Sequence, residues 1–121
     1  MSNKKALKAS YKQMKFRVGV FRIINTMNNK VLIEGSVNLD SIIKRHQFEL
    51  KSGAHKNEAL QKDWNEFGAD HFQFEILSEI QQDDNNQTDY RKEAKKLESM
   101  FIEEYQPFGT RGYHSGFNQL P

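Results

Sequence analysis

Three histidines and several lysine and arginine residues carry the side chains that could act on a metal ion or a phosphate. His46, His55 and His114 have the donor atoms of a zinc site, but their spacing matches no compact ligand motif. The chain has no cysteine, so neither a thiolate zinc site nor a disulfide can form. A zinc site built from these histidines is therefore not predicted.

Several basic residues lie close in sequence to His46 and His55. Clustered basic side chains gain affinity for a polyanion by releasing its condensed counterions. Asp40 and Glu49 lie among them and lower the local positive charge. The residues that would form a phosphate-facing edge here are Lys44, Arg45, Lys51 and Lys56.

Positive charge is concentrated at the N-terminus. Residues 1–17 contain six of the 18 basic residues and no acidic residue, and residues 18–121 carry a net charge of −4. We predict a basic arm at residues 1–16 and one domain at residues 17–121. Two interpretations of the arm remain open, namely contact with phosphates through Lys12, Lys15 and Arg17, or a solvated chain end.

Length and hydropathy limit the class of protein. The 121 residues fit a single domain, and a net charge of only +2 is below that of a protein that grips nucleic acid over its whole surface. Arg22 and the pair Lys44-Arg45 interrupt the most apolar stretches, so no segment suits a signal-peptide core or a membrane span. We expect a cytoplasmic protein that does not associate with membranes.

The elements that position the polar residues begin with a β-hairpin. Residues 17–25 and 30–33 are rich in β-branched and aromatic side chains, and the asparagine-rich residues 25–29 between them are a turn signal. Apolar periodicity predicts helices from Asn38 to Gly53 and from Asn57 to Gly68. Residues 72–76 alternate like a half-buried strand, and residues 81–87 resemble an exposed loop.

A longer third helix follows and ends before Pro107, and residues 108–121 are expected to form a tail pinned to the body. Trp64 and the phenylalanines near it are predicted to be core residues rather than base-stacking residues. The order β-β-α-α-β-α predicts an α+β domain in which helices cover a three-stranded antiparallel sheet.

The sequence resembles the GIY-YIG nuclease domain in the order and spacing of its motifs. Gly19-Val20-Phe21 stands where the family has Gly-Ile-Tyr, and Leu32-Ile33-Glu34 stands where it has Tyr-Ile-Gly. The resemblance covers roughly residues 17–114 and implies the GIY-YIG fold. Further matching segments are Asn28-Asn29-Lys30, Lys44-Arg45-His46, Gly53, His55, Leu60-Gln61, Gly68, Phe74-Glu75-Ile76-Leu77 and Glu98.

In this family two motif tyrosines and a helix arginine surround the scissile phosphate. The resemblance places the tyrosines at Phe21 and Leu32, the motif glycine at Glu34 and the arginine at Ile42. Phenylalanine cannot accept a proton, leucine cannot donate a hydrogen bond, and isoleucine cannot neutralise a phosphate. Losing one transition-state donor commonly costs about a hundredfold in rate, so the family's standard mechanism is not expected here.

The same resemblance assigns roles to the polar residues that remain. Glu98 matches the metal-binding position and would hold Mg²⁺ or another divalent cation at low occupancy, because a lone carboxylate leaves most ligand positions to water. His46 and His114 match catalytic-site positions, and His55 matches a position that contacts phosphate or caps the second helix. The alternatives are a solvated helix glutamate for Glu98 and a partly buried structural imidazole for His46. For Glu34 two interpretations remain, repulsion of the substrate backbone or an additional metal ligand.

Three functions remain open from the sequence. The first is a GIY-YIG domain that binds DNA weakly and has lost phosphodiester cleavage or retains it in much weakened form. The second is an active single-metal DNA endonuclease built on Glu98 and His46. The third is a protein-interaction module in which an apolar cleft lined by Phe21, Leu32 and Ile42 binds a protein partner.

Overall fold

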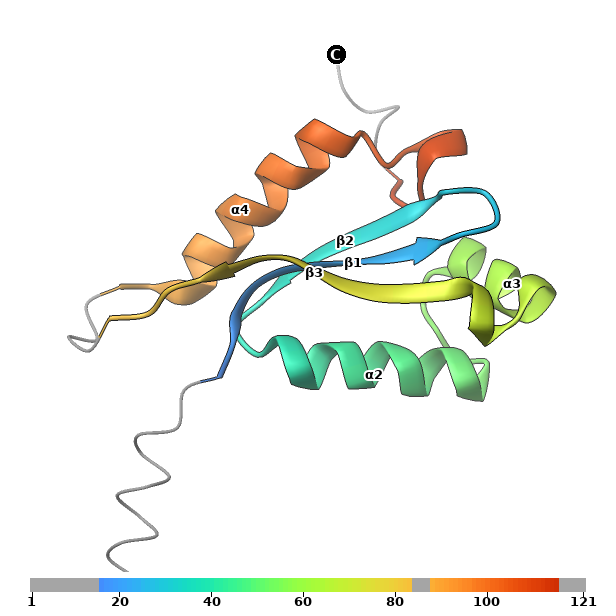
Figure 1. The fold of residues 1–121 in the computed structure, drawn as a ribbon, viewed down its shortest axis with the longest axis horizontal. Helices are drawn as coiled ribbons and strands as arrows, with labels where there is room; N and C mark the ends of the chain where they lie inside the picture. The colour runs from blue at the N-terminus through green and yellow to red at the C-terminus, as the bar shows by residue number, and fades with distance from the viewer. Residues whose placement is uncertain (1–15, 84–87, 116–121) are drawn as a thin grey trace, which may run out of the picture.

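The computed structural model describes residues 16–83 and 88–115 and has one three-stranded antiparallel sheet with helices on both faces (Figure 1). The strands β1 (Val18–Asn25), β2 (Val31–Ser36) and β3 (Phe72–Ile80) lie in the order β2-β1-β3. The helices are α2 (Leu39–Ser52), α3 (Glu58–Phe67) and α4 (Tyr90–Tyr105), with 3-10 turns at Ala69–His71 and Gly109–Arg111. The predicted α+β class and the order β-β-α-α-β-α are confirmed.

Local end signals determine where α2 and α3 begin and end. The Asn38 side chain accepts a hydrogen bond from the Ser41 N–H, and the Asn57 side chain accepts one from the Leu60 N–H. Gly53 ends α2 in the left-handed conformation with φ 78°, which a residue with a Cβ adopts only at a cost. After this turn the His55 side chain contacts His46 of α2, with 2.7 Å between Nε2 of His55 and Nδ1 of His46.

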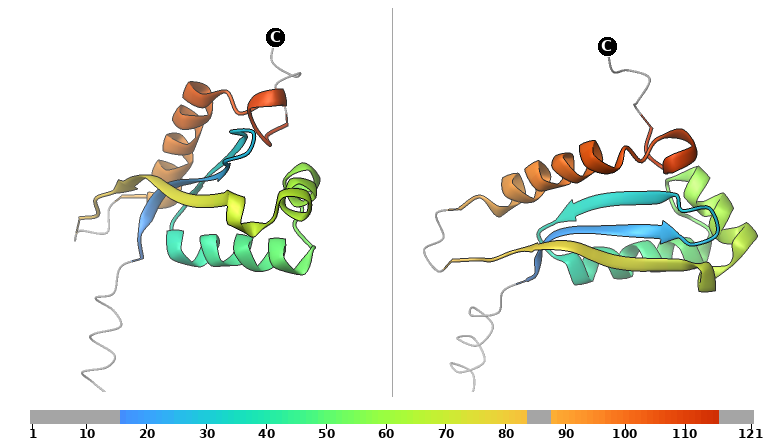
Figure 2. Two further views of the ribbon diagram at one scale, coloured as in Figure 1. Left: turned by 45° about the vertical axis from the view of Figure 1, so that its right-hand side comes forward. Right: turned by 45° about the horizontal axis from the view of Figure 1, so that its top comes forward.

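The alternation of side chains along the strands divides the core into two layers. Figure 2 shows the helices that cover them, with α2 and α3 on one face of the sheet and α4 on the other. Phe21, Ile23 and Leu32 pack with the apolar side chains of α2 and α3. Val20, Val31 and Ile33 pack with those of α4 on the other face of the sheet. The predicted core role of the aromatic residues is confirmed, because Trp64, Phe67, Phe72 and Phe74 all belong to the layer under α2 and α3.

The chain after α4 covers the free edge of β2. The Tyr113 N–H donates to the Val31 carbonyl at 3.0 Å, and the Ile33 N–H donates to Nε2 of His114 at 2.8 Å. The Tyr113 ring is buried, and its hydroxyl donates to Asp63 at 2.8 Å and accepts from the Asn25 amide at 3.1 Å. As far as residue 115 the tail is pinned as predicted, and β2 does not expose a row of unpaired backbone groups.

No helix of the described ranges is long and apolar enough to cross a membrane.

Candidate functional site

A chain of hydrogen bonds links three polar residues from different elements under the sheet. Nε2 of His46 lies 2.8 Å from Oε1 of Glu34, and Nδ1 of His46 lies 2.7 Å from Nε2 of His55. The Asn57 N–H donates to Nδ1 of His55 at 3.0 Å. His46 and His55 are only 4% and 6% exposed, so solvent contributes little to these contacts.

The backbone end of this chain fixes the direction of every hydrogen bond in it. Nδ1 of a neutral His55 accepts from Asn57, so its proton is on Nε2 and is donated to Nδ1 of His46. Nε2 of His46 therefore carries a proton and donates it to the Glu34 carboxylate. The result is a directed path from a backbone amide through two imidazoles to one carboxylate.

Contacts with neighbouring residues hold both histidines of this hydrogen-bonded chain in place. His46 lies on the side of α2 that faces the sheet and contacts the Phe21 ring edge-on, with 5.5 Å between ring centres. The His55 N–H donates to the Gln61 side chain, whose amide in turn donates to the Leu50 carbonyl, both at 3.0 Å. These bonds tie the loop after α2 to both helices and leave His55 little freedom.

Electrostatics favour the ionised form of Glu34 and the neutral forms of His55 and His114. Burial raises the pKa of Glu34, but the hydrogen bond from His46, with electrostatic contributions from His46, Lys56 and His55, outweighs it and lowers this pKa. Burial and the neighbouring His46 lower the pKa of His55. Burial also lowers the pKa of His114, whose Nε2 must keep a lone pair to accept the Ile33 N–H.

Glu34 and Glu98 line one pocket, with a volume of about 440 Å³, at the open end of β2. Glu34 reaches it from the strand, and Glu98 reaches it from α4 on the other side of the sheet. Oε2 of Glu98 accepts the Gly35 N–H at 2.8 Å. Arg91 and Lys95 of α4 also line the pocket, so two carboxylates and two cations share it.

Gly35 allows α4 to approach β2 closely enough for this contact. A Cβ at residue 35 would lie 2.6 Å from the Ala94 carbonyl oxygen and 3.2 Å from Cβ of Glu98. Any side chain there would therefore push α4 away from the strand. The sequence resemblance pointed to the preceding residue, Glu34, as the motif glycine position, and so missed the position at which the fold needs a glycine.

The three residues at the predicted motif positions lie in the apolar core or against it. Phe21 is 0% exposed and Leu32 is 9% exposed, and half-buried Ile42 packs against the same apolar cluster. These three residues do not line the pocket of Glu34 and Glu98. Of the three residues that the protein-interaction hypothesis places in an apolar cleft, Phe21 and Leu32 are therefore buried and Ile42 is half-buried.

His114 does not join the other histidines. Its imidazole accepts a hydrogen bond from β2 and lies against the Phe108 ring, at 6.3 Å between ring centres. Both residues belong to the chain after α4, which covers the edge of β2. The structure thus brings His46 and His55 together and places Glu98 in the pocket that Glu34 shares. His114 lies apart from these residues, and its Nε2 lone pair already accepts the Ile33 N–H of β2.

One group of metal-ligating side chains lies within the described residues. Ligand atoms of His46, Glu49 and His55 all lie within 4.8 Å of one another, so these side chains could hold a metal ion. In the hydrogen-bonded form, however, the His55 Nε2 proton occupies the space between the two imidazoles. An ion would bind here only after that hydrogen bond opened and His55 released its contact with Asn57.

The predicted phosphate-binding residues have different surroundings. Arg17 pairs with Asp40 at 3.3 Å and Glu79 at 3.1 Å, and Arg45 pairs with Glu49 at 3.3 Å. Lys12 and Lys15, like most of the predicted arm, lie outside the described residues. The exposed lysines of the predicted edge are Lys44, Lys51 and Lys56.

Sequence reasoning missed the basic side chains closest to the carboxylate pocket. Arg91 and Lys95 are one helical turn apart at the start of α4, on the side that faces Glu34 and Glu98. Their spacing of four residues was a usable signal, because it places them in line with Glu98 on one face of the helix.

Comparisons with known proteins identify solved structures with a similar fold. The chain is similar to the catalytic domain of the homing endonuclease I-TevI, with 28% identity, a TM-score of 0.67, and coverage of 82% of this chain and 98% of that domain. A mutant of the same catalytic domain gives 27% identity and a TM-score of 0.66 over 82% of this chain and 93% of that domain. These similarities support membership of the GIY-YIG family.

A curated relative supports the same membership for this GIY-YIG domain. Intron-associated endonuclease 1 of Enterobacteria phage T4 is 37% identical over 62 residues, which are 51% of this chain and 25% of that protein. The match thus spans about a quarter of the length of this relative. No protein-family profile matches the chain. A nuclease-like fold is therefore established for the domain.

Proposed function

We propose that this GIY-YIG domain binds the phosphates of DNA at the pocket of Glu34 and Glu98 and has lost efficient cleavage. The observation that carries the proposal is that Phe21, Leu32 and Ile42 pack into or against the apolar core, because the resemblance places these residues where the family has its phenols and guanidinium. Without groups that orient water and neutralise developing charge, the barrier to hydrolysis stays high. DNA-cutting relatives support nucleic acid as the ligand.

The charged residues around the pocket suit phosphate binding better than they suit the phosphodiester cleavage typical of the family. Arg91 and Lys95 provide two cations beside the carboxylates. Oxygen donors from Glu34 and Glu98 are the ligand type that Mg²⁺ prefers, so these two side chains are the ones that would hold a divalent cation. Such a cation, when bound, would screen the carboxylates from a phosphate and offer it a positive partner.

Salt-dependent binding tests the proposal. Fluorescence anisotropy with a labelled DNA duplex should give an affinity that falls with salt, and the double variant Arg91→Gln/Lys95→Gln should reduce the salt slope by about two. Lys62→Gln, an exposed lysine on α3, is the matched control and should leave the slope unchanged. An identical slope in the double variant and the wild type would contradict the assignment of this pocket.

The basic arm is tested separately with the same duplex. Deleting residues 1–15 should weaken binding if its lysines lie along phosphates. Binding that is insensitive both to salt and to this deletion would count against DNA as the ligand.

A second candidate function is a single-metal endonuclease built on Glu98 and His46. One observation favours it, because His46 donates to Glu34 and helps to keep this carboxylate ionised at the edge of the same pocket. An ionised carboxylate beside a cation site could accept a proton from water. This candidate differs from the leading proposal only in whether hydrolysis follows binding.

A magnesium-dependent nicking assay on supercoiled plasmid separates the two functions. The leading proposal expects no more nicking from the wild type than from Glu98→Ala and Glu98→Gln. Glu93→Ala, an exposed glutamate on the same helix, is the control for the preparation. Cleavage by the wild type and by Glu93→Ala that disappears in both Glu98 variants would establish the enzyme.

A further inference from the structure

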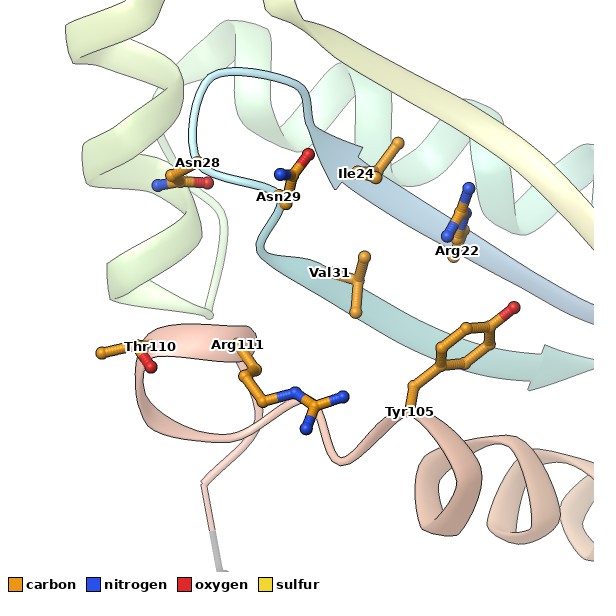
Figure 3. A pocket seen from close by; sticks show the side chains of 8 residues that line it. All are labelled: Arg22, Ile24, Asn28, Asn29, Val31, Tyr105, Thr110 and Arg111. Atoms are coloured by element: carbon orange, nitrogen blue, oxygen red, sulfur yellow. The ribbon is translucent and has the colours of Figure 1, made fainter.

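A second pocket, with a volume of about 390 Å³, lies at the other end of α4, where the hairpin turn meets the chain after that helix (Figure 3). It is lined by side chains from β1, the turn, β2, α4 and the turn at Gly109–Arg111. Apolar Ile24 and Val31 belong to the core layer under α4 and form one part of its lining. The polar groups that line it are Arg22, Asn28, Asn29, Tyr105, Thr110 and Arg111.

The two arginines differ in how they are held. Arg22 is fixed by Glu75, with both Nε and Nη2 2.7 Å from Oε1, and its guanidinium lies 5.9 Å from the centre of the Tyr105 ring. Glu75 thus compensates the charge of Arg22 and holds its fork in place. Arg111 is exposed, and no acidic side chain lines the pocket with it.

This combination matches a phosphate ester more closely than a simple carboxylate. A guanidinium fork binds either anion with two parallel hydrogen bonds. Here, however, the Arg111 fork, the N–H groups of Arg22 that Glu75 does not occupy, the Thr110 hydroxyl and the Asn29 side-chain amide offer more donors than the two oxygens of a carboxylate can use. The apolar part of the lining suits the sugar attached to a phosphate. We propose that this pocket binds the phosphate of a nucleotide.

The position of the pocket allows a DNA strand as one source of that phosphate. Ala94 lines the first pocket and Tyr105 lines the second, eleven residues apart on α4, which corresponds to roughly 16 Å along the helix axis. At about 3.4 Å per base pair, one duplex could present phosphates to both pockets about five base pairs apart. A free nucleotide is the other source of the same chemical group.

Chemical-shift mapping by NMR with the full chain tests the site directly. Deoxyadenosine 5′-monophosphate should shift the backbone amides of Asn29, Thr110 and Arg111, whereas deoxyadenosine and acetate at the same ionic strength should not. Arg111→Gln should weaken nucleotide binding at least tenfold, and Arg111→Lys should weaken it less because the charge remains without the fork. Lys62→Gln, an exposed lysine on α3 that lines neither pocket, is the matched control and should bind the nucleotide like the wild type.

A duplex oligonucleotide distinguishes the two sources. Weaker oligonucleotide binding by Arg111→Gln identifies a DNA strand as the source, and an effect confined to the free nucleotide identifies a mononucleotide. Equal binding of the nucleotide by Arg111→Gln and wild type, or shifts produced equally by deoxyadenosine, would overturn the inference. A negative result for this second pocket would not contradict the proposed function, because the first pocket is tested separately through Arg91 and Lys95.

Discussion

Substitutions in the Glu34, His46 and His55 chain test the direction in which its hydrogen bonds run. The Asn57 N–H occupies Nδ1 of His55, so His46 presents a lone pair to His55 and a proton to Glu34. Glu34→Gln retains an oxygen that accepts this proton. His46→Leu removes both hydrogen bonds and leaves the buried His55 Nε2–H without its partner. The two variants should therefore differ strongly in stability.

The expected magnitudes follow from the bonds that each variant loses. A neutral hydrogen bond contributes about 0.5–1.5 kcal/mol net, and one to a charged group about 1.5–3 kcal/mol. His46→Leu should lower the free energy of unfolding by about 2–4 kcal/mol, because it loses one bond of each kind. Glu34→Gln loses only the contribution of charge, which solvent screens at a side chain that is 33% exposed. Its cost should stay below about 1 kcal/mol.

Urea unfolding measures both effects through the fluorescence of Trp64. This is the single tryptophan, it is 8% exposed, and it packs against Phe72 at 5.2 Å between ring centres, so its emission reports loss of the core. Glu103→Gln, an exposed glutamate on α4, is the control. A Glu34→Gln variant as unstable as His46→Leu would refute the direction of the bonds, as would a nitrogen-15 NMR spectrum that places the His46 proton on Nδ1.

Three further outcomes follow from the same contacts. Gly35→Ala should destabilise the fold by about 1–3 kcal/mol in urea unfolding, because its Cβ would meet the Ala94 carbonyl, whereas Gly53→Ala would meet no neighbour and suffer only backbone strain. The lowered pKa values of His55 and His114 mean that the unfolded chain binds more protons, so thermal melts should show stability falling as pH drops from about 7 through these folded-state pKa values. Phe21→Tyr should restore no nicking and should cost about 1–3 kcal/mol of unfolding free energy, because it buries a hydroxyl in the core.

Local signals in the sequence were sufficient for the elements of this fold. Asn38 and Gly53 bracket α2, and Asn57 and Gly68 bracket α3, because caps depend on atoms within a few residues of one another. β2 runs three residues beyond its predicted end, to Ser36. That extension depends on pairing with β1, which is not a local property.

The site was harder to predict because it depends on contacts between distant residues. Glu34 meets His46 only because strand alternation turns Glu34 to the same face as Leu32 and because the phase of α2 turns His46 toward the sheet. The order of residues placed these two side chains close in sequence without indicating that they share a hydrogen bond. The pocket of Arg22 and Arg111 combines a strand with a turn 89 residues later in the chain, so no motif spacing could reveal it.

Glu98 has two roles that a substitution to alanine cannot separate. Its Oε2 satisfies the Gly35 N–H at the edge of β2, while a carboxylate has a second oxygen that can bind a cation in the pocket. Glu98→Ala removes both, so loss of activity in that variant could follow from a loosened contact between α4 and β2. Glu98→Gln keeps a carbonyl oxygen for Gly35 and removes the negative charge that a divalent cation requires. An effect of magnesium that survives alanine and glutamine alike therefore arises elsewhere, whereas one that glutamine abolishes without lowering stability belongs to the carboxylate itself.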